Sequence, residues 1–447
     1  MTRIQRTFLL SLAVLAGLWT LADPTWPQPF KYFSFRAWAM QGTGVLAIGA
    51  MSLIMVLAVR PVWLEPPLQG LDKMYRLHKW LGITALVTAV VHWWLGQGTK
   101  WMVGWGWLVR PQRGPRPAAA DQPLLEAWLG SQRGLAETVG EWAFYLAAVL
   151  MVLALVKRFP YRWFAKTHTV LAAGYLALVF HSVVLLKWTY WTQPVGLLMA
   201  VLMVAGSVAA VLVLGRRIGA RRKVSAVVTA TERFDAVQSL EFRVRVDAGW
   251  PGHRAGQFAF VTTDAAEGAH PFTMASAWNP ETRELRFIAK ALGDHTAALP
   301  RQLQAGQTVT VEGPYGCFDF DDGAPRQIWV GAGIGITPFI ARLEHLAASG
   351  SARGQQIDLF HPTAQEEPLA LLRLKAAARA AGVRLHLMVD RRDGLLDGEH
   401  LRRTVPDWAQ ASLWFCGPAA FGRALKADLS AHGLRASAFH QELFEMR

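Results

Sequence analysis

The stretch LHKWLGITALVTAVVHWW, residues 77–94, is apolar over most of its length and holds a histidine near each end. Fourteen residues separate His78 from His92. On a helix this spacing is a rise of about 21 Å, and it brings the second side chain back within roughly 40° of the first. The run therefore predicts a membrane-spanning helix with two imidazoles on one face. Ionisable groups inside a membrane are costly and usually functional.

Six segments of the first half are apolar and long enough to cross a bilayer, which takes roughly 17–25 residues. Arg3 and Arg6 precede the first segment as they would a signal peptide, but no clear small-x-small cleavage site follows, so we expect a retained span. The prediction is an all-α six-helix transmembrane bundle in contact with membrane lipid, with spans near 7–22, 37–59, 78–97, 138–156, 168–187 and 194–215.

Positive charge is concentrated in the first half of the chain. Residues 1–223 hold 23 Lys and Arg against 7 Asp and Glu, and residues 224–447 hold 23 against 25, so the net charges of +16 and −2 sum to the +14 of the whole chain. The basic residues gather in short loops between alternate spans, as in cytoplasmic loops. We therefore expect both termini to be cytoplasmic, at the inner (cell) membrane of a bacterium. A nucleic-acid partner is not expected, since its basic face would lie on a soluble domain.

Histidines and cysteines narrow the possible redox centres. Only two cysteines occur, which excludes a cysteine-ligated iron–sulfur cluster. The fifth apolar run holds His168 and His181, thirteen residues apart, and the four runs without a pair hold no histidine. A single imidazole could cap a helix end, but two pairs on two helices favour two stacked metal centres such as haems. Thirteen residues leave the second pair about 140° out of line on an ideal helix, so that span would bend or approach its haems obliquely.

The two spacings, with HKW opening the third run, resemble the haem-binding core of the ferric reductase and NADPH oxidase superfamily. The resemblance covers spans two to six and implies two b-type haems. Their axial ligands would be His78 with His168 on the cytoplasmic side, and His92 with His181 on the outer side. Eukaryotic oxidases of the superfamily often carry another histidine where this chain has Gly96, which disfavours a dedicated superoxide producer.

Residues 224–322 contain short β segments between turn residues, which predicts an antiparallel β-barrel. The stretches HPFTMAS (270–276), KALGDHT (290–296) and VEGPYG (311–316) suit a flat heteroaromatic ring, a diphosphate and a rigid turn, respectively. In this order they resemble the FAD-binding domain of the ferredoxin–NADP reductase type. The resemblance implies a non-covalently bound FAD and six contact residues: His270, Pro271, Phe272, Thr273, Gly293 and Thr296.

Residues 323–447 alternate strands and helices, which predicts a Rossmann-like α/β NAD(P)-binding domain after the membrane domain (1–223) and the FAD domain (224–322). In RQIWVGAGIGITPFIARLEHL, glycines between a strand and a helix let the backbone approach a pyrophosphate. The spacing G-x-G-x-G-x-x-P resembles the same reductase family. The implied binding residues for NADPH or NADH are Gly331, Gly333, Gly335, Thr337, Pro338, Gly417 and Pro418.

Catalytic candidates also come from that resemblance. Cys416 opens the CGP motif near the nicotinamide, and Phe444 in the tail FHQELFEMR would cover the flavin, with Phe439 as a second candidate; a core strand accounts for either phenylalanine equally well. The choice between NADPH and NADH stays open. DLFHPTAQEE lacks an arginine for a 2′-phosphate, although Arg391 and Arg392 follow the next strand.

Together these features predict a multi-domain membrane protein, a transmembrane flavocytochrome b. It would pass electrons from cytosolic NAD(P)H through FAD and two b haems to an acceptor across the membrane. Ferric chelates are the first expected acceptor, oxygen (giving superoxide) the second, and a quinone or a periplasmic protein the third. Two other classes stay open: a haem-free, membrane-anchored flavin reductase or sensor, and a channel or transporter with a regulatory nucleotide domain. The oligomeric state is not predicted.

Overall fold

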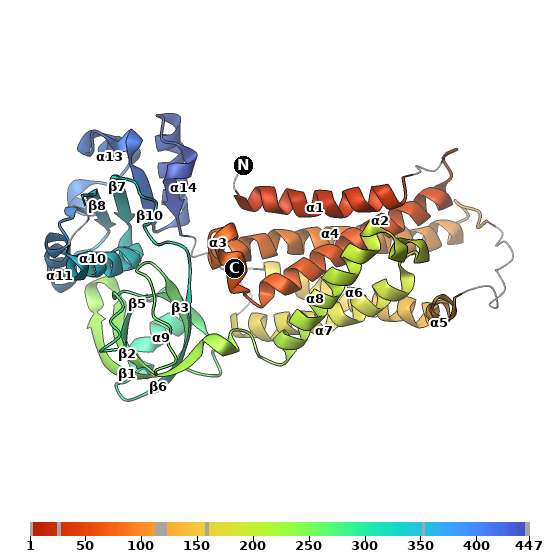
Figure 1. Cartoon of the computed structure of the whole chain (residues 1–447), viewed down its shortest axis with the longest axis horizontal. Coiled ribbons are helices and arrows are strands. Elements are labelled where there is room, and N and C mark those ends of the chain that lie inside the picture. Colours follow the sequence, from red (N-terminus) through yellow and green to blue (C-terminus); the bar gives the residue numbers. More distant parts are fainter. Residues whose placement is uncertain (1–2, 25–27, 112–122, 157–160, 351–353, 443–447) are drawn as a thin grey trace. The chain divides into compact units, whose positions relative to one another are not determined.

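The computed structural model describes residues 3–24, 28–111, 123–156, 161–350 and 354–442. The chain forms two compact units, a helical unit (Met1–Leu64 and Lys73–Ile218) and a unit with two sheets (Glu65–Asp72 and Gly219–Met446). Figure 1 shows long helices in the first and the sheets in the second. The predicted domain boundaries at 223 and 322 stay predictions.

Long helices make up the described part of the helical unit: α1 (Arg3–Ala22), α2 (Tyr32–Ala58), α4 (Leu71–Gly104), α6 (Arg133–Leu155), α7 (Tyr161–Leu185) and α8 (Pro194–Leu214). All except α4 contain a stretch long and apolar enough to cross a membrane, which makes five candidate spans in the described residues. Helix α4 is the longest, at 34 residues, but it carries polar residues among its apolar ones. The sixth predicted span, on α4, therefore stays a prediction.

Small residues let the long helices approach one another closely. A Cβ added at Gly49 of α2 would lie 2.7 Å from Leu15 of α1, and one at Gly206 of α8 would overlap the Tyr175 hydroxyl of α7. Membrane helices pack through small residues in this way. The opposite face of α8 presents an exposed apolar stripe at helical spacing, as a lipid-facing surface does: Leu197, Val201, Val204, Val208 and Val211.

The first sheet of the second unit is antiparallel, with strand order β4-β3-β6-β1-β2-β5. Its core follows from alternation: along β5, Leu285, Phe287 and Ala289 are buried and their neighbours are not. A single bridge between Met274 and Phe287 joins the end of β4 to β5, so the sheet edges meet there. This bridge supports the predicted barrel, which stays a prediction. The strands are β1 (Lys223–Phe234), β2 (Ser239–Val246), β3 (Phe258–Thr262), β4 (His270–Thr273), β5 (Glu284–Lys290) and β6 (Thr308–Tyr315), with α9 (Asp294–Gln302) before β6.

The second sheet is parallel, with strand order β11-β10-β7-β8-β9. Strand β7 pairs with β8 on one side and β10 on the other, so the order of the strands reverses at β7. In sheets of this kind ligands bind beyond the carboxyl ends of the strands at such a reversal. The elements are β7 (Arg326–Gly331), α10 (Thr337–Ser349), β8 (Gln356–Thr363), α11 (Pro368–Ala380), β9 (Arg384–Val389), β10 (Ser412–Cys416), α14 (Ala419–Ala431) and β11 (Phe439–Gln441).

Candidate cofactor sites

The four histidines of the helical unit lie as two pairs, each with one member on α4 and one on α7. The ring centroids are 5.9 Å apart for His78 and His168, and 6.2 Å apart for His92 and His181. Two imidazoles on opposite sides of one metal, with nitrogens about 2 Å from it, have centroids about 6 Å apart. The rings are therefore spaced as axial ligands of a haem iron would be. Both histidines of α7 reach their partners despite the thirteen-residue spacing.

The pair of His92 and His181 is anchored to neighbouring helices. The Nδ1 atom of His92 lies 3.1 Å from Met40 O and 3.1 Å from Thr43 Oγ1, both on α2. The Nδ1 atom of His181 lies 2.8 Å from Ala136 O on α6. A carbonyl oxygen only accepts, so Nδ1 is the protonated nitrogen of each ring, and Nε2 keeps the lone pair that a metal needs.

The pair of His78 and His168 lacks hydrogen bonds of this length at Nδ1. The Nδ1 atoms of His78 and His168 are buried and make no hydrogen bond within 3.5 Å in the described part of the chain, although the His78 ring interacts with the Ile54 backbone of α2. The ring of His168 instead stacks on Phe164, one turn earlier on α7, with centroids 5.0 Å apart. The two pairs therefore share a ring spacing and differ in their surroundings.

The flavin candidates lie on and beside β4. The hydroxyl of Thr273 is buried without a hydrogen-bond partner, a rare state in native proteins and one that a polar edge of a bound ring would relieve. Phe272 instead packs in the core of the first sheet, edge-to-face with Phe242 at 5.8 Å, so it fixes the strand. Pro271 is half-buried. Burial, and then the neighbouring His295, lower the pKa of His270 to about 4.

The turn that begins α9 is built by Thr296. Its hydroxyl accepts hydrogen bonds from the backbone N–H of Leu292 at 3.0 Å and of Gly293 at 3.1 Å, and lies 3.1 Å from Gly293 O. Thr296 therefore shapes the start of the helix, where N–H groups without helical partners suit a diphosphate. His295, which the sequence did not single out, stacks on His270 with centroids 3.9 Å apart and planes 10° apart. Such parallel rings do not aim their lone pairs at one metal ion, although Glu267 lies nearby.

The glycine-rich loop after β7 meets the end of β10, at the reversal of strand order. Ala332 N donates to Cys416 O at 2.9 Å, and a Cβ added at Gly335 would overlap that carbonyl oxygen. Gly333 has φ +53°, which favours glycine. The hydroxyl of Thr337 donates to Ile334 O at 2.7 Å and so holds the loop at the start of α10.

Pro338, Gly417 and Pro418 complete the predicted set around this loop. Pro338 is buried in the first turn of α10, where a proline fits because the first helical N–H groups have no partner. Gly417 and Pro418 follow β10 directly, and a Cβ at Gly417 would lie 2.7 Å from the Cβ of Ala332. The loop after β7 and the turn after β10 are therefore in direct contact.

Two residues at this edge of the parallel sheet were missed from the sequence. Glu442 directly follows β11, is 4% exposed and lies near Cys416. Burial, and then the Glu442 carboxylate, raise the pKa of the Cys416 thiol. His361 of β8 is buried and donates Nδ1–H to Gly331 O at 2.7 Å. The sequence signal for Glu442 was a carboxylate between the two tail phenylalanines, Phe439 and Phe444, whereas a single histidine in a strand gave none for His361.

Of the two candidate phenylalanines in the tail, the structure describes only Phe439. Phe439 is buried in the core of the parallel sheet, where its ring stacks on Phe415 with centroids 6.2 Å apart. It is therefore a core residue of β11. Phe444 lies outside the described residues, so its predicted place over the flavin stays a prediction.

Residues 43–179 match the protein family described as "Ferric reductase like transmembrane component". The chain is 31% identical over 157 residues to an NADPH oxidoreductase of Mycobacterium tuberculosis, covering 34% of this chain and 40% of that protein. It is 30% identical over 190 residues to the ferredoxin–NAD(+) reductase component of the alkene monooxygenase system of Xanthobacter autotrophicus, covering 40% and 57%. The chain thus spans about half the length of these curated relatives.

Among solved structures, flavohemoglobin from Malassezia yamatoensis with bound FAD and heme has a TM-score of 0.48 and 17% identity, with 99% of each chain covered. The family match covers most of α2 and all of α4 and α6. Of the two histidines of α7, it includes His168 but not His181. The family match and the reductase relatives confirm the resemblance inferred from the histidine spacing and the flavin and nucleotide motifs. The chain thus joins a segment similar to ferric reductase transmembrane components to a half similar to NAD(P)H-dependent reductases.

Proposed function

We propose that the chain is an NAD(P)H-dependent transmembrane oxidoreductase that carries electrons from NAD(P)H through FAD and two b haems to an acceptor across the membrane. The main support for this proposal is the spacing within the two histidine pairs, whose ring centroids lie 5.9 and 6.2 Å apart. Nicotinamide, flavin and haem supply the hydride and one-electron chemistry when bound. The chain positions them and shields them from water.

In this proposal His78 and His168 would hold one haem, and His92 and His181 would hold the other. Imidazoles on both sides of an iron leave no open coordination position, which suits electron transfer. The anchored Nδ1–H groups of His92 and His181 keep Nε2 available for iron. The bundle would therefore conduct electrons, and the acceptor would receive them without binding to a haem iron.

The reductase half binds the other two cofactors. The unpaired Thr273 hydroxyl and the start of α9 with Gly293 would hold FAD by its ring and its diphosphate. The loop of Gly331, Gly333 and Gly335 would hold the dinucleotide at the start of α10. Cys416 and Glu442 would lie beside the nicotinamide, with Phe444 over the flavin.

The direction of transfer follows from the basic loops. The loops support a topology with both termini on the cytoplasmic side of a bacterial inner membrane, in which NAD(P)H would be used inside and the acceptor would lie outside. Ferric chelates are the proposed acceptor and oxygen is the alternative. Turnover of the purified protein with each, driven by NADH and by NADPH, compares them directly.

Absorption spectroscopy of the purified full chain tests the proposal. We expect bound FAD and two low-spin b haems per chain, all reduced by NAD(P)H. His92→Ala and His78→Ala should each lose one haem, whereas His432→Ala, at an exposed histidine after α14, should keep both. A protein that binds flavin but no haem would instead be a membrane-anchored flavin reductase.

A further inference from the structure

The two histidine pairs differ in the contacts of their Nδ1 atoms. His92 and His181 each donate Nδ1–H to a backbone carbonyl, Met40 O at 3.1 Å and Ala136 O at 2.8 Å. Among the described residues, the buried Nδ1 atom of His168 has no such acceptor; that of His78 makes no hydrogen bond within 3.5 Å, although its ring interacts with the Ile54 backbone of α2. One site therefore has two imidazoles anchored through Nδ1–H, whereas the other has an unanchored His168 and a His78 whose ring interacts only with the Ile54 backbone.

Two residues of neighbouring helices, Thr43 and Gly140, make the hydrogen bonds of His92 and His181 possible. The Thr43 hydroxyl lies 2.7 Å from Ala39 O, one helical turn earlier, to which it donates its hydrogen; its oxygen is then left to accept from His92 Nδ1 at 3.1 Å. Gly140, buried on α6, faces the ring of His181, and a Cβ there would overlap Nδ1 and its neighbours. Any other residue at 140 would push the ring away from Ala136 O.

These contacts act on the iron through the ring. A hydrogen bond from Nδ1–H to an acceptor makes the ligating nitrogen a stronger electron donor, which favours ferric over ferrous iron. Two such imidazoles on one iron act in the same direction. We propose that the haem held by His92 and His181 has the lower reduction potential, and that Thr43 and Gly140 are positioning residues that set it. This inference rests on the proposed function.

A redox titration of the full chain, followed by haem absorption, tests the assignment. We expect two one-electron steps in the wild type, and His92→Ala should remove the step at lower potential. Thr43→Val should move that lower step upward and leave the higher step in place, because one acceptor of the His92 N–H is lost. Thr43→Ser, which keeps the hydroxyl, should restore the wild-type value.

Gly140→Ala gives an independent readout. We expect it to change the electron paramagnetic resonance signal of one low-spin haem, because the His181 ring must turn or shift. Gly134→Ala is the matched control on α6, since Gly134 is exposed and a Cβ there meets nothing within 4 Å; both signals should be unchanged. If His92→Ala loses both haems, the shift of the lower step in Thr43→Val, and its return in Thr43→Ser, still test the assignment of the lower potential.

The outcomes separate this inference from the function on which it rests. Two haems whose potentials are unmoved by Thr43→Val, or loss of the higher step in His92→Ala, would overturn the potential assignment and leave the proposed function intact. A wild-type protein without haem would overturn both.

Discussion

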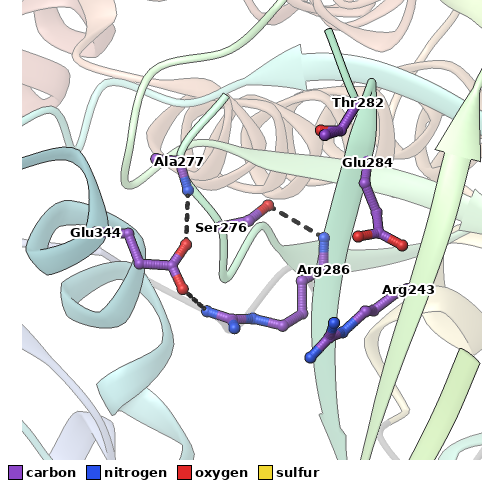
Figure 2. A pocket seen from close by; sticks show the side chains of 7 residues that line it. All are labelled: Arg243, Ser276, Ala277, Thr282, Glu284, Arg286 and Glu344. Carbon is purple, nitrogen blue, oxygen red and sulfur yellow. Dashed lines mark hydrogen bonds and ion pairs between the residues drawn. The ribbon is translucent and has the colours of Figure 1, made fainter. Parts of the chain in front are cut away.

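Arg286 on β5 and Glu344 on α10 form an ion pair that joins the antiparallel sheet to the first helix of the parallel-sheet region (Figure 2). The same carboxylate accepts from Ala277 N at 3.1 Å, and Arg286 Nη2 also donates to Ala275 O at 2.6 Å. Helix α10 begins at Thr337, next to the glycine-rich loop. The pair therefore holds that loop at a fixed position relative to the segment that follows β4.

Breaking this pair should loosen the link between the two sheets. Arg286→Ala leaves Glu344 half-buried without its cation, and we expect a loss of about 1–3 kcal/mol in the stability of the reductase half. The KM for NAD(P)H should rise, because α10 is less well placed. Thermal release of FAD and steady-state kinetics measure the two effects.

The chain offers a matched control for this experiment. Arg373 on α11 pairs with Glu232 on β1, which also joins the two sheets, but the side chains are 46% and 36% exposed against 19% and 35% for Arg286 and Glu344. Exposed pairs contribute about 0–1 kcal/mol, so Arg373→Ala should have a small effect. Equal losses in both variants would contradict a special role for Arg286.

Acid should weaken the reductase half through His253. Burial lowers the pKa of His253 to about 4, although its Nε2 donates to Ser276 O at 2.8 Å. The unfolded chain binds a proton near pH 6.5 and the folded chain only near 4, so stability should fall as the pH decreases through this window. The contribution of this group is up to about 3 kcal/mol.

His253→Gln keeps a donor for Ser276 O and cannot titrate. Between pH 7 and pH 4, its urea midpoint for the reductase half, followed by FAD release, should decrease less steeply than that of the wild type. Parallel curves for the two proteins would show that other groups, such as His270, account for the acid sensitivity.

Cys416 should resist thiol reagents. Burial and the nearby Glu442 raise the pKa of its thiol, so little thiolate is present at pH 8, and the side chain is fully buried. Iodoacetamide at pH 8 should therefore label Cys317, which is half-buried, before Cys416. Peptide mass spectrometry measures both sites, and faster labelling of Cys416 would exclude this environment.

Coenzyme preference should follow the ion pairs of Arg392. Its guanidinium lies 2.7 Å from Glu366, after β8, and 2.9 Å from Asp393, after β9. A guanidinium held by two carboxylates is poorly available to a 2′-phosphate, so we expect NADH to be preferred. Glu366→Ser should raise kcat/KM for NADPH relative to NADH by about tenfold. Arg391→Ala is the control, and an unchanged ratio in Glu366→Ser would exclude Arg392 as a determinant.

The sequence predicted features that depend on local spacing. Fourteen residues of helix bring His78 and His92 back to one face whatever surrounds them, and the order of flavin and nucleotide motifs identified the fused architecture. Contacts between distant segments were not predictable in this way. Thr43 and Gly140 matter only because α2 and α6 pack beside α4 and α7, and Glu442 matters because β11 places it near Cys416.

The closeness of Gly335 to Cys416 O limits how the coenzyme pocket can be redesigned. A bulkier loop grafted after β7 would collide with the neighbouring turn after β10. Chimeras that exchange the glycine-rich segment and the CGP segment together, as one cassette from a single donor, should remain folded where single exchanges do not.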